Sequence, residues 1–127
     1  MNLLLINSSP IPLYEQLKEQ IKQGILRGDP AGGELLPSIR SLAQSLSTSV
    51  ITVKRAYDDL ERDGYIFTAP GKGTFVSTYS RGQAREDYLK QLDQQVDLLV
   101  EKAQSLGISC RELQALIAEK YGAGKQN

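Results

Sequence analysis

The sequence has no histidine, no tryptophan and a single cysteine, Cys110. The lack of histidine excludes a serine–histidine triad, histidine acid–base catalysis and histidine metal ligation. One cysteine cannot form an intramolecular disulfide or a cysteine-based metal site. Cys110 lies among residues expected to be helical, where a packed or half-exposed small residue is typical. We therefore expect a protein that is not an enzyme and that needs no metal or cofactor.

Long apolar runs are also absent, and none approaches the roughly 20 residues needed to cross a bilayer. The apolar run at residues 3–6 has no basic residue before it and no small-residue cleavage site after it. We expect it to form an extended arm or edge strand rather than a signal peptide. The 127 residues suffice for one modest domain with an appendage, and we expect a cytoplasmic protein without membrane association.

The chain lacks net charge, since 15 Lys/Arg are balanced by 15 Asp/Glu. Phosphate contacts dominate nucleic-acid affinity, so evenly mixed charges would argue against a nucleic-acid binder. The distribution is uneven, however. The stretch from Leu36 to Tyr57 contains three cations and no acid, and Gly64 to Arg81 also contains cations only. A neutral protein of this pattern can present one positive face to a polyanion.

Apolar spacing predicts three helices in the first half of the chain. An amphipathic helix is predicted over residues 12–27 by the spacing of Leu13, Leu17, Ile21 and Ile25. A second helix is predicted over residues 38–47, capped by Ser38, and a third after a tight turn, capped by Ser49. The apolar face of the third helix consists of Val53, Ala56, Tyr57 and Leu60. Its opposite face consists of Ile51, Arg55 and Arg62, flanked by Thr52 and Lys54.

Residues 65–68 and 74–77 are predicted to be two strands around the glycine-rich turn at residues 69–73. Because a two-stranded hairpin is not stable alone, it is expected to pack on the helices. The prediction is a mainly α fold with a small β-hairpin, that is, a winged helix-turn-helix. A positive surface on such a fold is typical of a DNA-binding protein.

The last third of the chain is predicted to be a polar linker, at residues 79–83, followed by two helices. Heptad-like spacing predicts a helix over residues 84–106 with a seam of Leu89, Leu92, Val96, Leu99, Ala103 and Leu106. Ser109 and Glu112 form a capping-box pattern before a helix whose apolar residues include Leu113, Leu116 and Ile117. Residues 122–127 are expected to fray.

Two helices in fewer than fifty residues cannot bury a core of their own. Their apolar residues can pack on the winged domain or on a second copy of the chain. Self-association is favoured, because short reading helices usually bind two half-sites. We expect a DNA-binding domain over residues 1–78 and a dimerisation region over residues 79–127.

The segments at residues 12–17, 36–43, 50–66 and 70–76 together resemble the DNA-binding domain of the GntR family of bacterial transcription regulators, in order and in spacing. The short C-terminal region resembles that of the YtrA-like subfamily. The resemblance implies DNA contacts by Arg40, Lys54 and the wing-tip Gly71, and a target near the protein's own operon. Three positions depart from the family pattern, which usually has arginine at Val50, glycine at Ser47 and proline at Gly32.

The candidate DNA-binding residues are Ser38, Arg40, Ser49, Ile51, Thr52, Lys54, Arg55, Gly71, Lys72, Gly73 and Thr74. Lys54 and Arg55 are expected to read bases, although ion pairs with Asp58 and Asp59 one turn later are an alternative. Ile51 is expected to be exposed, where a thymine methyl contact would explain it. Arg40 is interpreted as a phosphate or base contact rather than a solvated charge.

These patterns predict a homodimeric regulator, in its simplest form a repressor, that binds an inverted-repeat operator. A winged-helix module that binds proteins and not DNA is the alternative. The residues do not identify an effector.

Overall fold

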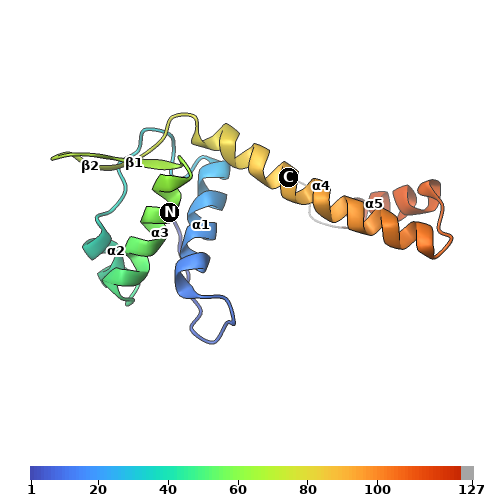
Figure 1. Cartoon of the computed structure of the whole chain (residues 1–127), viewed down its shortest axis with the longest axis horizontal. Helices are drawn as coiled ribbons and strands as arrows, with labels where there is room; N and C mark the ends of the chain where they lie inside the picture. Colours follow the sequence, from blue (N-terminus) through green and yellow to red (C-terminus); the bar gives the residue numbers. More distant parts are fainter. Residues whose placement is uncertain (124–127) are drawn as a thin grey trace. The chain divides into compact units, whose positions relative to one another are not determined.

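The computed structural model describes residues 1–123 (Figure 1). Its helices and strands are α1 Leu13–Arg27, α2 Ile39–Ser45, α3 Val50–Arg62, β1 Ile66–Ala69, β2 Gly73–Val76, α4 Ser80–Ser105 and α5 Cys110–Ala123. The chain divides into two compact units, one from Met1 to Asp87 and the other from Tyr88 onward. This element order confirms the predicted fold class.

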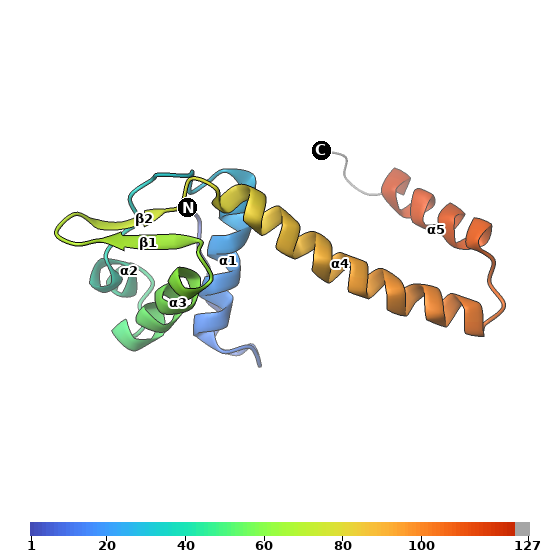
Figure 2. The same ribbon diagram turned by 45° about the horizontal axis from the view of Figure 1, so that its top comes forward.

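The first unit is built on α1 and α3, each of which buries one face. Leu17, Ile21 and Ile25 of α1 are essentially inaccessible, as are Val53, Ala56 and Leu60 of α3. Gly28, with φ of 89°, ends α1 in the left-handed conformation that favours glycine. The helices α2 and α3 lie on the same side of the hairpin, as Figure 2 shows. The predicted stripes of α1 and α3 are therefore confirmed.

The strands β1 and β2 pair antiparallel, with Ile66 opposite Val76 and Ala69 opposite Gly73. A third segment that the sequence did not reveal lines the other edge of β2. Leu35 bridges to Phe75, and the Leu36 N–H donates to the Thr74 carbonyl at 2.8 Å. Residues 33–36 thus tie the base of the wing to the chain that enters α2.

The N-terminal residues form the extended arm that the sequence favoured, without joining the sheet. Two glutamines one turn apart on α1 hold its backbone. Gln20 accepts from the Leu4 N–H at 2.8 Å and donates back to its carbonyl at 2.6 Å. Gln16 does the same for Ile6, at 2.8 and 3.0 Å. Each amide side chain thus bonds the backbone N–H and carbonyl of one arm residue, as a neighbouring strand would.

The predicted linker at residues 79–83 is wrong, because α4 already begins at Ser80. Ser80 and Ala84 are buried in the first unit, and the Arg81 Nε donates to the Leu26 carbonyl at 3.0 Å. The Tyr65 hydroxyl donates to Asp87 on the next turn of α4. Burial, and then this bond, raise the pKa of Tyr65. The polar residues that suggested a linker instead fix the first turns of α4 to the winged domain.

The second unit contains the turn between α4 and α5. The Ile108 N–H donates to the Ala103 carbonyl at 2.9 Å, and Gly107 has φ of 71°, which together form a Schellman motif. Ser109 and Glu112 bond reciprocally at 3.1 Å, as the capping box predicts. The backbone bond at Ser109 lowers the pKa of Glu112. Residues 122 and 123, expected to fray, are helical; the other four of that segment lie outside the described residues.

Within residues 1–123, no helix combines the length and apolarity that a membrane span requires. The same residues hold no group of three or more side chains suited to a metal ion.

Among the described glycines, Gly24 of α1 leaves the least room for a side chain. A Cβ atom there would lie 2.3 Å from the Asp29 carbonyl oxygen, so Gly24→Ala forces the chain after α1 to move. We expect the free energy of unfolding to fall by about 1–3 kcal/mol, measured by thermal or urea denaturation. Gly82→Ala in α4 is the matched control, since its Cβ meets nothing within 4 Å. It should stabilise by about 0.5–1 kcal/mol, and equal effects at both sites would contradict the packing.

Candidate nucleic-acid interface

The turn between α2 and α3 sets the direction of α3. Ser47 has φ of 53°, and the Thr48 N–H donates to the Ala43 carbonyl at 2.9 Å. Ser49 caps α3 as predicted, because its Oγ accepts from the Thr52 N–H at 3.1 Å. The Thr52 hydroxyl lies 2.8 Å from the same oxygen. The side chains of Ser49 and Thr52 are therefore both hydrogen-bonded at the N-terminal end of α3.

Two apolar side chains are exposed in the first turn of α3. Ile51 is 78% exposed and Val50 is 44% exposed, while Val53 behind them is fully buried. The predicted exposure of Ile51 is confirmed. The surface at Val50 and Ile51 therefore offers methyl groups to a partner.

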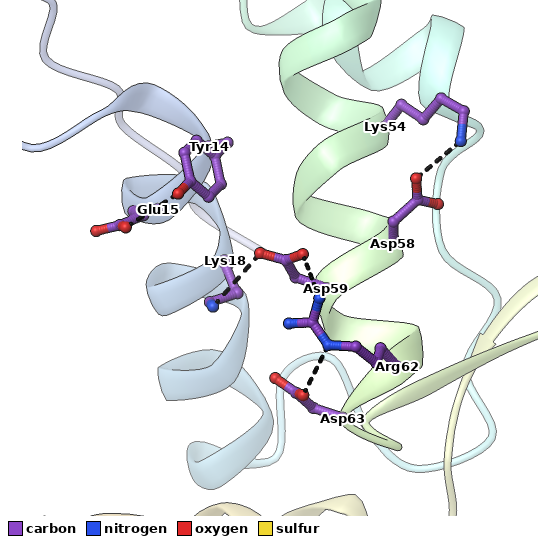
Figure 3. A network of polar contacts seen from close by, with 8 residues as sticks. All are labelled: Tyr14, Glu15, Lys18, Lys54, Asp58, Asp59, Arg62 and Asp63. Carbon is purple, nitrogen blue, oxygen red and sulfur yellow. Dashed lines mark hydrogen bonds and ion pairs between the residues drawn. The ribbon is translucent and has the colours of Figure 1, made fainter.

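The cations of α3 have different partners. Lys54 pairs with Asp58 at 2.8 Å, so the alternative ion pair at i+4 forms (Figure 3). Arg55 does not pair with Asp59. Its guanidinium carbon instead lies 3.7 Å from the ring centre of Tyr14 on α1.

The carboxylates of α3 gather in its C-terminal half, where Asp59 is ion-paired and Glu61 accepts from Thr68 of the wing. Asp59 contacts Lys18 of α1 at 3.6 Å and Arg62 at 3.2 Å, and Arg62 reaches Asp63 at 3.5 Å (Figure 3). This network spans α1 and α3. It leaves the N-terminal half of α3 as the part of the helix suited to approach phosphate.

The start of α2 lies beside α3 through a buried contact. The Tyr57 hydroxyl donates to the Pro37 carbonyl at 2.8 Å, and burial raises the pKa of Tyr57 to about 12. Ser38 caps α2 as predicted, since its Oγ accepts from the Ser41 N–H at 3.1 Å. Arg40, in the first turn, is exposed and has no ion-pair partner among the described residues.

The tip of the wing is a tight turn closed by the Lys72 N–H and the Ala69 carbonyl at 2.9 Å. Pro70 followed by Gly71, with φ of 76°, suits a type II turn. A Cβ at Gly71 would meet nothing, whereas one at Gly73 would lie 2.7 Å from Leu35. Gly73 therefore has a packing role. The free surface of the turn is made by Gly71 and Lys72.

Thr74 is also partly committed within the wing. Its Oγ1 lies 3.4 Å from that of Thr68 across the hairpin, and its carbonyl accepts from Leu36. The sequence did not single out Tyr14 as a residue of the site. No periodic pattern links a residue of α1 to one of α3, so only the fold reveals the pair.

The expected dimer seam is mostly exposed, as unpartnered apolar residues would be. Leu89, Leu92, Val96, Leu99 and Leu106 are between 43% and 63% exposed. Ala103 is the exception, because it is only 6% exposed. It lines a cavity of about 100 Å³ with Ile108 and the half-buried Leu113, within the chain's own α4–α5 turn. Ala103 therefore packs largely within its own chain, and its contact with a partner stays a prediction.

A sequence profile described as "Bacterial regulatory proteins, gntR family" matches residues 13–76, from α1 to the end of β2. The chain belongs to the GntR family. It is 34% identical over 122 residues to the HTH-type transcriptional repressor YtrA of Bacillus subtilis, and the match covers 94% of each chain. Family membership confirms the predicted resemblance.

Two solved structures extend the comparison. A GntR family transcriptional regulator from Listeria monocytogenes has a TM-score of 0.72 and 28% identity, over 91% of this chain and 98% of that one. The AraR DNA-binding domain in complex with operator ORX1 has a TM-score of 0.54 and 29% identity, over 61% of this chain and 99% of that one. The predicted winged fold is thus confirmed, and so is the class of DNA-binding transcription regulators.

The left-handed Ser47 gives a prediction on stability. A non-glycine residue in this conformation costs roughly 1–2 kcal/mol, and glycine removes that cost while adding freedom to the unfolded chain. We expect Ser47→Gly to stabilise by about 0.5 kcal/mol in thermal denaturation and to leave DNA affinity unchanged. Ser45→Gly, at the last residue of α2, is the control and should destabilise. Destabilisation by Ser47→Gly would show that the serine side chain is needed there.

Proposed function

We propose that this protein is a transcription repressor that binds an inverted-repeat operator as a homodimer. Its place in the GntR family and its similarity to the YtrA repressor support this role. The observation that carries the proposal is the capped N-terminal half of α3. This half bears the exposed Lys54 and Arg55, while Asp58 and Asp59 of the same helix are ion-paired.

In this proposal the N-terminal half of α3 enters the major groove. Lys54 releases Asp58 and contacts a base edge or a phosphate, and the methyl groups of Ile51 contact a thymine methyl. Arg40 and the wing turn at Gly71 and Lys72 contact backbone and position the helix. Ser38, Ser49, Thr52, Gly73 and Thr74 act mainly by holding these elements, because their polar groups or backbone are committed within the protein.

The proposed dimerisation region spans residues 79–127, with the DNA-binding domain over residues 1–78. The proposed contacts between copies are Leu89, Leu92, Val96, Leu99, Ala103, Leu106, Leu113, Leu116 and Ile117. A second copy would cover these side chains and would bring two reading helices to one operator, which is what an inverted repeat requires. We propose no catalytic activity and a cytoplasmic location.

The DNA proposal is tested by binding. Selection from random DNA yields the operator, and fluorescence anisotropy then measures affinity at several salt concentrations. We expect the logarithm of affinity to fall linearly with that of salt concentration. Lys54→Ala with Arg55→Ala should weaken binding by at least about 30-fold and lower the salt slope by about two.

Arg62→Ala is the control for position, because it removes a positive charge from the acidic half of α3 instead of the N-terminal half. It should change operator affinity by less than about threefold. Binding that is indifferent to salt, or unaffected by the double substitution, would favour the alternative of a protein-binding module.

The dimer proposal is tested by sedimentation of the full chain at micromolar concentration. We expect a dimer for the native chain and a monomer for Leu99→Glu, because a charge in the seam would lose its water on association. Leu98→Glu is the matched control, since Leu98 is 68% exposed and lies beside the seam rather than in it. A native chain that sediments as a monomer would refute the seam.

A further inference from the structure

Arg55 and Tyr14 form a contact between the reading helix and α1. The guanidinium carbon lies 3.7 Å from the ring centre, well within the roughly 6 Å over which a cation is attracted to an aromatic face. The contact joins residues forty-one positions apart in the sequence, so it depends on the packing of α1 on α3. That packing is firm, because Leu17 and Ile21 behind Tyr14 are fully buried.

The stacked arrangement leaves the hydrogen-bonding edge of Arg55 free. A guanidinium contacts a ring through its face, while its N–H donors lie in its plane and point outward. No carboxylate pairs with Arg55 among the described residues, whereas on the same helix Lys54 pairs with one and Arg62 with two. Arg55 is therefore held in place without being neutralised.

The position of Arg55 also limits what it can reach. It is held against the side of α3 that faces α1, whereas the exposed tip of the helix is formed by Val50 and Ile51. A side chain that leans on the neighbouring helix lies at the flank of a helix inserted in a groove, where the phosphates run. This differs from the expectation that Arg55 reads a base.

We infer that Tyr14 is a positioning residue for operator binding, and that it holds Arg55 ready for a backbone phosphate. The inference rests on the proposed DNA binding. Because the arginine is ordered before DNA arrives, less side-chain freedom is lost on binding. The Tyr14 hydroxyl bonds Glu15 at 3.1 Å and is not needed for the stack. The ring is the functional part.

The test uses the full chain and measures the operator affinity of the native protein and four variants. The variants are Tyr14→Phe, Tyr14→Leu, Arg55→Ala, and Tyr14→Leu with Arg55→Ala. Tyr14→Phe keeps the ring and should bind within about twofold of the native chain. Tyr14→Leu should weaken binding about 5- to 10-fold, as expected for one side chain that is no longer ordered beforehand. In the Arg55→Ala background, Tyr14→Leu should have little further effect.

Two further readouts separate this role from a general loss of structure. Arg55→Ala should lower the salt slope by about one and weaken binding equally for the operator and for single-base variants of it, as a phosphate contact does. Thermal denaturation should show all five proteins folded, because Arg55 and the exposed edge of Tyr14 lie outside the core.

The inference is overturned if Tyr14→Leu binds like the native chain, if its effect adds fully to that of Arg55→Ala, or if Tyr14→Phe fails as badly as Tyr14→Leu. A change of base preference in Arg55→Ala would overturn the phosphate assignment. In all these cases the native chain still binds DNA with salt dependence, so the proposed function stands. A native chain that does not bind DNA overturns both.

Discussion

The packing of α1 against α3 is the constraint on which the rest of the structure depends. The buried faces of the two helices leave α3 one orientation, and every group proposed to meet DNA takes its direction from it. The same packing places Lys18 beside Asp59 and Tyr14 beside Arg55. It therefore also determines which charged side chains form ion pairs. The hydrophobic core thus determines which cations are paired with acids and which stay available.

Zero net charge is compatible with DNA binding because the charges are separated along one helix. Near the C-terminal end of α3, Asp59 forms ion pairs with Lys18 and Arg62. These pairs weaken its repulsion of phosphate. The surface proposed to meet DNA is then a short positive segment beside exposed apolar residues. Such a surface offers few phosphate contacts per copy, and the proposed dimer would double them.

Much of the fold followed from the sequence because its signals are local. The stripes of α1 and α3, the caps at Ser49 and Ser109, and the turn at Gly71 each depend on residues within a few positions of one another. The features that escaped prediction join distant segments. Leu35 pairs with Phe75, and Arg55 contacts Tyr14. Such contacts produce no periodic pattern of residues in the sequence.

The start of α4 escaped for a related reason. A run of polar residues was interpreted as a linker, but polarity describes only the outward side of a helix. Ser80 and Ala84, small enough to pack closely one turn apart, provide the inward side. The positions of the candidate DNA-binding residues on α2, α3 and the wing followed from the sequence. Which of their side chains are already bonded within the protein depended on the hydrogen bonds and ion pairs that the fold makes.

The arm before α1 has an unusual kind of order. A strand in a sheet is held cooperatively, whereas this segment is held by two side-chain amides, those of Gln16 and Gln20, each of which can release its residue alone. In hydrogen-exchange terms, the arm should open at a cost well below that of global unfolding. Displacement of two rotamers would free the half-buried Leu3 and Leu5 beside the already exposed Leu4 and Ile6, so a weakly held segment is also one of the most apolar in the chain.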